Sequence, residues 1–152
     1  MTSRWRCLAQ VGLPFLWAGL VLGLSFVETP LKFRAPGITR ELGLGIGRLV
    51  FATLNRIELV LAVAVLLAWW PERRRWSTRG LLAGLGAILL AQTLWLLPVL
   101  DARALAMIAG ETLVPSSHHV LFVIVEAVKL GLLLALGCSV RLDVGRLDAA
   151  RP

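Results

Sequence analysis

Apolar residues gather in four long blocks along the chain, at about 8–27, 44–70, 81–100 and 118–138, and polar residues separate the blocks. A membrane-spanning helix needs ~20 apolar residues, because each residue adds ~1.5 Å and the hydrocarbon layer is ~30 Å thick. A membrane barrel would show alternating segments of ~10 residues, which the sequence does not contain. The pattern predicts an all-α, integral membrane four-helix bundle, with residues 1–152 as one membrane domain.

Composition agrees with a membrane location. Hydrophobic residues make up 58% of the 152 residues, and the mean hydropathy is +0.81. A soluble domain of this size could not bury so much apolar surface. The first block follows Arg4 and Arg6, as a signal peptide would. However, its apolar run exceeds the usual ~7–15 residues and no small-residue cleavage site follows, so we expect a retained helix.

The net charge of +7 does not indicate a nucleic-acid partner, because its distribution follows the predicted topology. Basic residues concentrate before the first block, between the second and third, and after the fourth. The positive-inside rule then predicts an inner-membrane protein with both termini in the cytoplasm. The arginines of the middle segment are expected to contact anionic lipid headgroups; they are Arg73, Arg74, Arg75 and Arg79.

Two of the apolar blocks contain polar and charged residues. These are Arg48, Asn55, Arg56 and Glu58 in the second block and His119, Glu126 and Lys129 in the fourth. Residues seven apart lie within ~20° on a helix, and residues ten apart within ~80°. Both helices run in the same direction, so equal spacing means equal depth. We therefore predict that Glu58 faces Lys129, and that Glu126 lies within reach of Arg56 or Lys129. This polar seam between helices two and four would open toward the outer side.

A second set of polar residues is expected at the outer rim of the seam. Its members are Glu28, Lys32, Arg34, Asp101, Arg103 and His118. His119 together with Glu28, Asp101 or Glu111 would make a weak metal or proton site. The alternative is that the adjacent histidines, which point ~100° apart, simply start a helix.

Other cofactor and catalytic signals are weak. Haem ligation by two helices would need a histidine elsewhere, and the chain has two histidines in all. Cys7 and Cys138 lack the spacing of a metal motif. Sequences typical of zinc proteases, P-loops and serine hydrolases do not occur. We therefore expect no metal or other cofactor, and an enzyme is the least favoured class.

A short internal sequence similarity links the two halves of the chain. "TPLKFRA" at 29–35 and "LPVLDARA" at 97–104 each place a proline and then Arg-Ala after an apolar helix. This indicates two parallel helix hairpins as one possible arrangement, as in transporters built from repeats.

The segment "WAGLVLGLSFVETPLKFRAPGITRELGLGIGRLVF" resembles the first half of the small four-helix membrane family that includes transmembrane protein 205 of animals. Matching positions are Pro30, Lys32, Phe33, Gly45, Gly47 and Phe51. "LWLLPVLDARA" and "SSHHVLFVIVEAVKL" are similar to later parts of that family. The resemblance implies the four-helix fold and little about mechanism. The chain departs from the family at Glu126 and Lys129, where small polar residues are expected.

Three hypotheses about function follow from the seam. The first is binding or transport of a small ligand, ion or proton. The second is a salt-bridge network that only fixes helix packing. The third is a non-catalytic accessory subunit of a larger membrane complex. A homo-oligomer or a membrane partner protein is compatible with each of them.

Overall fold

The computed structural model describes residues 3–70 and 76–149, with side chains from 5 to 70 and from 76 to 140. Its first helical run is α1 (Ser3–Val21), the π-helix η1 (Leu22–Glu28) and α2 (Thr29–Lys32). The second is α3 (Arg40–Ala68). The third is α4 (Trp76–Ala91), the π-helix η3 (Gln92–Leu96) and α5 (Leu97–Ile108), and the fourth is α6 (His118–Ala149). No strand occurs in the described ranges.

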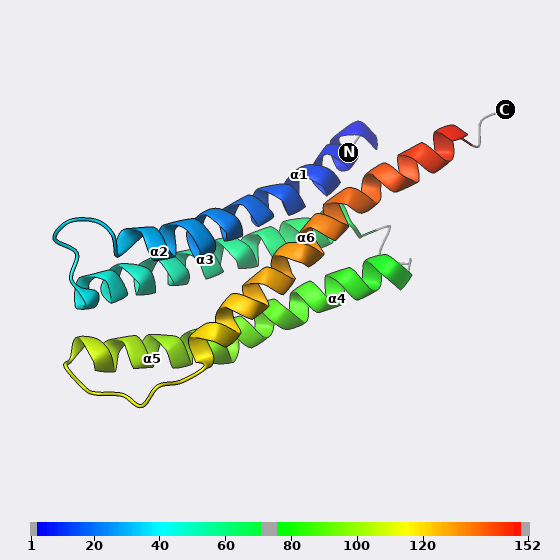
Figure 1. Cartoon of the computed structure of the whole chain (residues 1–152). Coiled ribbons are helices and arrows are strands. Elements are labelled where there is room, and N and C mark those ends of the chain that lie inside the picture. The colour runs from blue at the N-terminus through cyan, green and yellow to red at the C-terminus, as the bar shows by residue number, and fades with distance from the viewer. Residues whose placement is uncertain (1–2, 71–75, 150–152) are drawn as a thin grey trace.

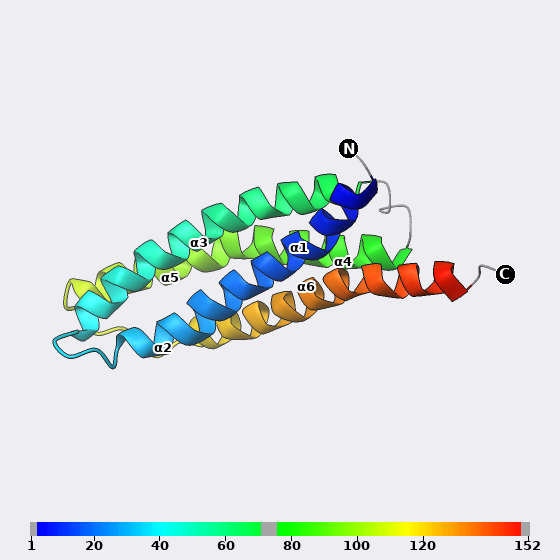
Figure 2. The same cartoon turned by 90° about the horizontal axis from the view of Figure 1, so that it is seen from above.

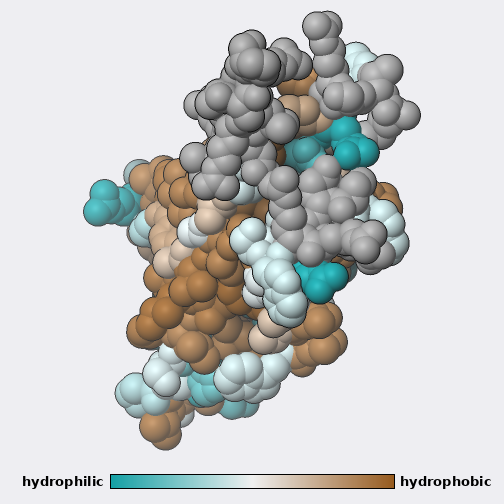
Figure 3. Space-filling view, turned by 90° about the vertical axis from the view of Figure 1, so that its right-hand side faces the viewer, coloured by the Kyte–Doolittle hydropathy of each residue, from teal (hydrophilic) through white to brown (hydrophobic). Residues whose placement is uncertain are grey.

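Four helical stretches are long and apolar enough to cross a membrane. They are Trp5–Lys32, Arg40–Ala68, Trp76–Ile108 and His118–Val140. Large apolar side chains point outward from them: Leu94 is 74% exposed, Leu49 72% and Leu67 68%. Among the coloured residues in Figure 3, brown apolar ones form a broad continuous area. Such a surface suits lipid rather than water, so the chain is a multi-pass membrane protein and the predicted four-helix membrane bundle is confirmed.

The four helical runs form two hairpins that point the same way (Figure 1). One end of the bundle carries the loops around 33–39 and 109–117, and we name it the loop end. The other carries both chain termini, and we name it the terminal end. The first run packs against both α3 and α6, and the third run packs against both α3 and α6. Helices α3 and α6 therefore lie diagonally across the bundle, with α1 between them on one side (Figure 2).

The helical runs are longer than their apolar blocks predict. The third is expected to end at residue 100, yet α5 continues to Ile108, and the first is expected to end at 27, yet α2 continues to Lys32. Both extensions pass a proline, Pro30 or Pro98, that occupies the first turn after a π-helix. The backbone continues as a helix through each π-turn into the proline. A π-turn already departs from the regular hydrogen-bond ladder that a proline would interrupt, so these prolines do not end the helical runs.

The two hairpins share more than their direction. Each has a π-helix followed by a proline in its first run and a glutamate deep in its second. Pro30 and Pro98 are 68 residues apart, and so are Glu58 and Glu126. The two glutamates therefore occupy equivalent places in the two hairpins.

The terminal half of the bundle has an apolar core. Trp17, Val21, Val65, Leu133 and Leu136 are all at most 1% exposed and belong to one cluster. At the loop end, the absence of a side chain at Gly43 and Gly47 admits the Phe33 ring and the Lys32 ammonium. Glycines therefore let side chains, rather than a second helix backbone, approach the start of α3.

Candidate functional site

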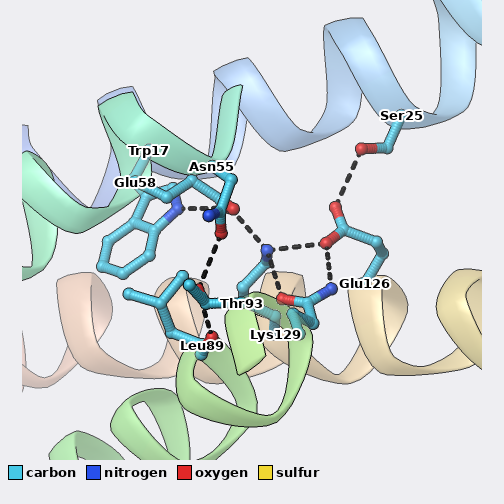
Figure 4. A network of polar contacts seen from close by, with 9 residues as sticks. Trp17, Ser25, Asn55, Glu58, Leu89, Thr93, Glu126 and Lys129 are labelled. Carbon is cyan, nitrogen blue, oxygen red and sulfur yellow. Dashed lines mark hydrogen bonds and ion pairs between the residues drawn. The ribbon is translucent and has the colours of Figure 1, made fainter. Parts of the chain in front are cut away.

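A buried cluster of three charged side chains lies at the centre of the bundle. Lys129 Nζ lies 2.5 Å from Glu58 Oε1 and 2.6 Å from Glu126 Oε1. Lys129 is 0% exposed, Glu126 1% and Glu58 3%. Figure 4 shows the lysine between the two carboxylates. The helical spacing predicts both pairs, and the structure forms both.

Uncharged side chains complete the cluster from the other two helical runs. Glu58 Oε1 accepts a hydrogen bond from Trp17 Nε1 at 2.8 Å. Ser25 donates to Glu126 Oε2 at 2.8 Å, and Gln92 Nε2 donates to Glu126 Oε1 at 2.6 Å. Gln92 Oε1 in turn accepts from Lys129 at 2.9 Å. All four helical runs therefore contribute to a network that satisfies the buried lysine fully.

The π-helices explain how two of these groups reach the centre. Ser25 lies in η1 and Gln92 lies in η3. A π-turn inserts an extra residue into a helix and re-aims the side chains around it, which is why such turns are frequent at functional sites. Both π-helices direct a hydrogen-bond donor to the same carboxylate, that of Glu126.

The cluster contains more carboxylates than cations. Glu58 and Glu126 occupy equivalent places in the two hairpins, but Lys129 has no equivalent, because the position 68 residues earlier is Leu61. With both carboxylates ionised, the cluster would hold one uncompensated negative charge. A buried uncompensated charge is costly, and such groups take up a proton or another cation instead. The site is therefore suited to binding one additional positive charge.

A cavity of about 350 Å³ leads to this cluster, and we name it the Glu126 cavity. Ser25, Thr29, His119 and Glu126 supply its polar lining, and phenylalanines supply most of the rest. His119 lies at the loop-end start of α6, one ~10 Å step above Glu126 on the helix. The apolar core closes the opposite direction, toward the terminal end. Access to the cluster is therefore from the loop end.

The location of the seam differs from the prediction. Helices α3 and α6 are diagonal rather than adjacent, so the long Lys129 side chain crosses the bundle centre between the first and third helical runs. Asn55 bonds to Thr93, whose hydroxyl lies 2.9 Å from Asn55 Oδ1. Arg56 is exposed and has no ion pair with Glu126. The predicted alternative of an Arg56–Glu126 contact is wrong because Arg56 points away from the bundle centre.

A second, larger cavity of about 910 Å³ lies beside α3 and α5, and we name it the arginine cavity. It borders the Glu126 cavity, since Thr29, Phe33, Phe51 and His119 line both. Asn55 and Arg56 mark its deep end. Of the helix-two residues in the predicted seam, Arg48, Asn55 and Arg56 therefore line this cavity, and Glu58 alone pairs with a side chain of α6.

The predicted rim residues divide between ion pairs and the open surface. Arg48 forms two hydrogen bonds with Asp101, at 2.6 and 3.0 Å, which join α3 to α5. Lys32 lies 3.2 Å from Glu28, one helical turn away. Arg103 donates to the Val114 carbonyl.

The remaining rim residues do not join either cavity. His118 packs edge-on against Trp95, and Arg34 is exposed in the loop and lines neither cavity. His119 and Asp101 both line the arginine cavity, but the described part of the chain contains no group of three acidic, histidine or cysteine side chains able to hold a metal ion.

The arginines expected at lipid headgroups are only partly described. Arg73, Arg74 and Arg75 lie outside the described residues. Arg79 belongs to α4, where its guanidinium lies 5.7 Å from the Trp76 ring centroid at the terminal end. Contact with anionic lipid stays a prediction.

Sequence reasoning missed three members of the cluster: Trp17, Ser25 and Gln92. The sequence does mark Gln92 as a candidate, because Gln92 and Thr93 are adjacent uncharged polar residues inside the apolar stretch "LLAQTLWLL". Nothing in the sequence marks Ser25 or Trp17, since single serines and tryptophans are common in membrane helices. Their role depends on how the helices are arranged.

Comparison with protein-family models, curated proteins and solved structures finds no match for this chain. The resemblance to the family of transmembrane protein 205 therefore stays a prediction. The class that fold and site define is a four-helix, multi-pass membrane protein with a buried ionisable cluster.

Proposed function

We propose that this membrane protein binds a proton at the cluster of Glu58, Lys129 and Glu126 and takes part in moving protons across the membrane. One observation carries the proposal. A cavity from the loop end reaches Glu126, and Glu126 belongs to a buried cluster with one carboxylate more than its single lysine can neutralise. Ionisable groups in this position are typical of proton pathways in membrane transport proteins.

The hydrogen bonds favour a proton over a metal cation. Both oxygens of Glu126 already accept hydrogen bonds, and Glu58 Oε1 accepts from Trp17 and Lys129. A sodium-like or calcium-like ion needs several free oxygen ligands, whereas a proton needs one lone pair. No described side chain donates to Glu58 Oε2, which makes that oxygen a suitable place for the proton.

The geometry suggests an order of steps. His119 and Glu126 line one cavity, and an imidazole has one ring nitrogen that can accept a proton and one that can donate. Glu126 would receive the proton, and the Lys129 ammonium would link it to Glu58. Release toward the terminal end requires the apolar core around Leu133 to open. In our proposal the loop end faces outward from an inner membrane, as the distribution of basic residues predicts.

Proton flux into proteoliposomes tests the proposal. Wild-type protein is reconstituted with a pH-sensitive dye inside the vesicles, and the outside is acidified in the presence of a potassium ionophore. We expect Glu126→Gln and Glu58→Gln to reduce the initial flux at least about tenfold. Glu41→Gln is the matched control, because it removes a carboxylate that is exposed in the first turn of α3 and lines neither cavity.

Infrared spectroscopy tests proton binding separately from transport. The wild type should show a protonated-carboxyl band that disappears in the Glu58→Gln, Glu126→Gln double variant and persists in Glu41→Gln. Flux equal to wild type in both single glutamine variants would contradict the transport proposal. Together with an unchanged carboxyl band, it would leave the packing network or the accessory subunit as the function of the cluster.

A further inference from the structure

The arginine cavity carries a strong excess of positive charge. Five basic side chains line it: Lys32, Arg40, Arg48, Arg56 and Arg103. Asp101 is the one carboxylate among its lining residues, and it is already bound by Arg48. Positive charges gathered in a concave, low-dielectric site raise the local concentration of anions.

Most of these cations have weak or distant compensation. Arg40 reaches only the Met107 sulfur, at 3.6 Å, and Arg103 reaches a backbone carbonyl at 2.7 Å. Lys32 has Glu28, and its ammonium also lies 5.5 Å from the Phe51 ring centroid. Arg56 is the extreme case, because it has neither a hydrogen bond nor an ion pair with any described residue.

The depth of Arg56 makes its isolation costly. It lies about 16 residues into α3, or ~24 Å from the start of that helix, and two residues before the buried Glu58. An arginine at this depth of a membrane protein normally pairs with an anion or lines an aqueous space. No carboxylate among the described residues pairs with Arg56, so an anion that enters the cavity from outside is the partner that would neutralise it.

The size and lining of the cavity define the ligand. A volume of about 910 Å³ lies within the ~300–1,000 Å³ of sites for organic molecules and greatly exceeds the needs of a halide. Leu44, Leu97, Leu100, Met107 and Leu113 give it apolar walls. The apolar walls suit a ligand with an apolar body, and the arginines suit a carboxylate or phosphate group on that ligand.

We infer that the arginine cavity binds an amphipathic anion, with one carboxylate or phosphate group held by Arg56 and an apolar body packed against α3 and α5. Asn55 lies beside Arg56 at the deep end, where its amide is positioned by Thr93. The same chemistry is offered by a soluble organic anion and by an anionic lipid. This site is distinct from the charged cluster, because Glu58, Lys129 and Glu126 do not line it, although His119 lines both cavities.

Binding of decanoate to the full-length protein in maltoside micelles tests the inference. Dissociation constants are taken from the thermal stabilisation by decanoate, decyl phosphate and the neutral decanol. We expect both anions to bind at least about tenfold more tightly than decanol, since the alcohol hydroxyl offers a neutral hydrogen bond in place of a charge-assisted one. Native mass spectrometry with phosphatidylglycerol against phosphatidylcholine then distinguishes the lipid source from the soluble one.

Three variants make the test specific. Arg56→Gln should weaken anion binding at least about tenfold and leave decanol unchanged, whereas Arg56→Lys should retain most of it. Arg34→Gln removes the same charge at the loop end but lines neither cavity, so it should bind as wild type. Glu126→Gln should also bind normally, which separates this result from that of the proton site. Equal binding of decanol and decanoate, or unchanged anion binding in Arg56→Gln, would overturn the inference.

Discussion

Replacing Lys129 should destabilise the bundle far more than replacing either of its glutamates. In Lys129→Met, two ion pairs of 2.5 and 2.6 Å are lost, and two carboxylates remain buried with no cation between them. Removing one partner of a buried pair costs about 3–5 kcal/mol. Methionine keeps the length and flexibility of the side chain, so the loss reflects charge rather than packing.

The glutamate variants start from a different charge balance. Glu126→Gln leaves Lys129 paired one to one with Glu58. The new amide oxygen can still accept from Gln92 and Lys129, and its NH2 group can donate to the Ser25 hydroxyl, which then acts as the acceptor. Charge-assisted bonds are exchanged for neutral ones, while the excess negative charge disappears. We therefore expect a cost below about 1 kcal/mol, and the same for Glu58→Gln. The gap between Lys129→Met and either glutamine variant should be about 2–4 kcal/mol.

Unfolding in mixed micelles measures this order. Purified variants are titrated with dodecyl sulfate and followed by circular dichroism, and Lys129→Arg serves as the charge-preserving control. If Lys129→Met does not insert into membranes, the double variant Glu58→Gln, Glu126→Gln provides the converse test, because it leaves the lysine buried without a carboxylate. Equal losses in Lys129→Met and Glu126→Gln would refute the reasoning from charge excess.

Three further predictions concern single contacts and topology. Trp17→Phe removes the hydrogen bond to Glu58 but keeps most of the ring, and should cost about 1.5–3 kcal/mol in the same unfolding assay; a loss under 0.5 kcal/mol would mean that the bond is not formed. Asp101→Asn should cost no more than about 1 kcal/mol, because the Arg48–Asp101 pair is partly exposed, with side chains 31% and 46% accessible; a larger loss would show that this pair anchors α5. In a cysteine-free background, Ala35→Cys at the loop end should react with a membrane-impermeant maleimide added outside intact cells, and labelling only after lysis would reverse the proposed orientation.

The linear order of residues determined the class of this protein. Four blocks of about 20 apolar residues specify spanning helices, because backbone groups must bond internally in lipid. Helical periodicity also placed Glu58 and Lys129 at one depth, since 1.5 Å and ~100° per residue hold whatever the helices pack against. Periodicity did not reveal that the helical runs continue past Pro30 and Pro98, because it does not show the π-turns that precede those prolines.

The tertiary structure alone decided which polar groups meet. Whether α3 and α6 are adjacent or diagonal depends on how four similar apolar surfaces pack, and hydropathy does not distinguish those arrangements. The diagonal arrangement places Trp17, Ser25 and Gln92 around the buried ion pairs. It also pairs Arg48 with Asp101 and directs Arg56 into a separate cavity. A helix fixes the relative directions of its own side chains, but the neighbours that they contact depend on how the whole helix is rotated and packed within the bundle.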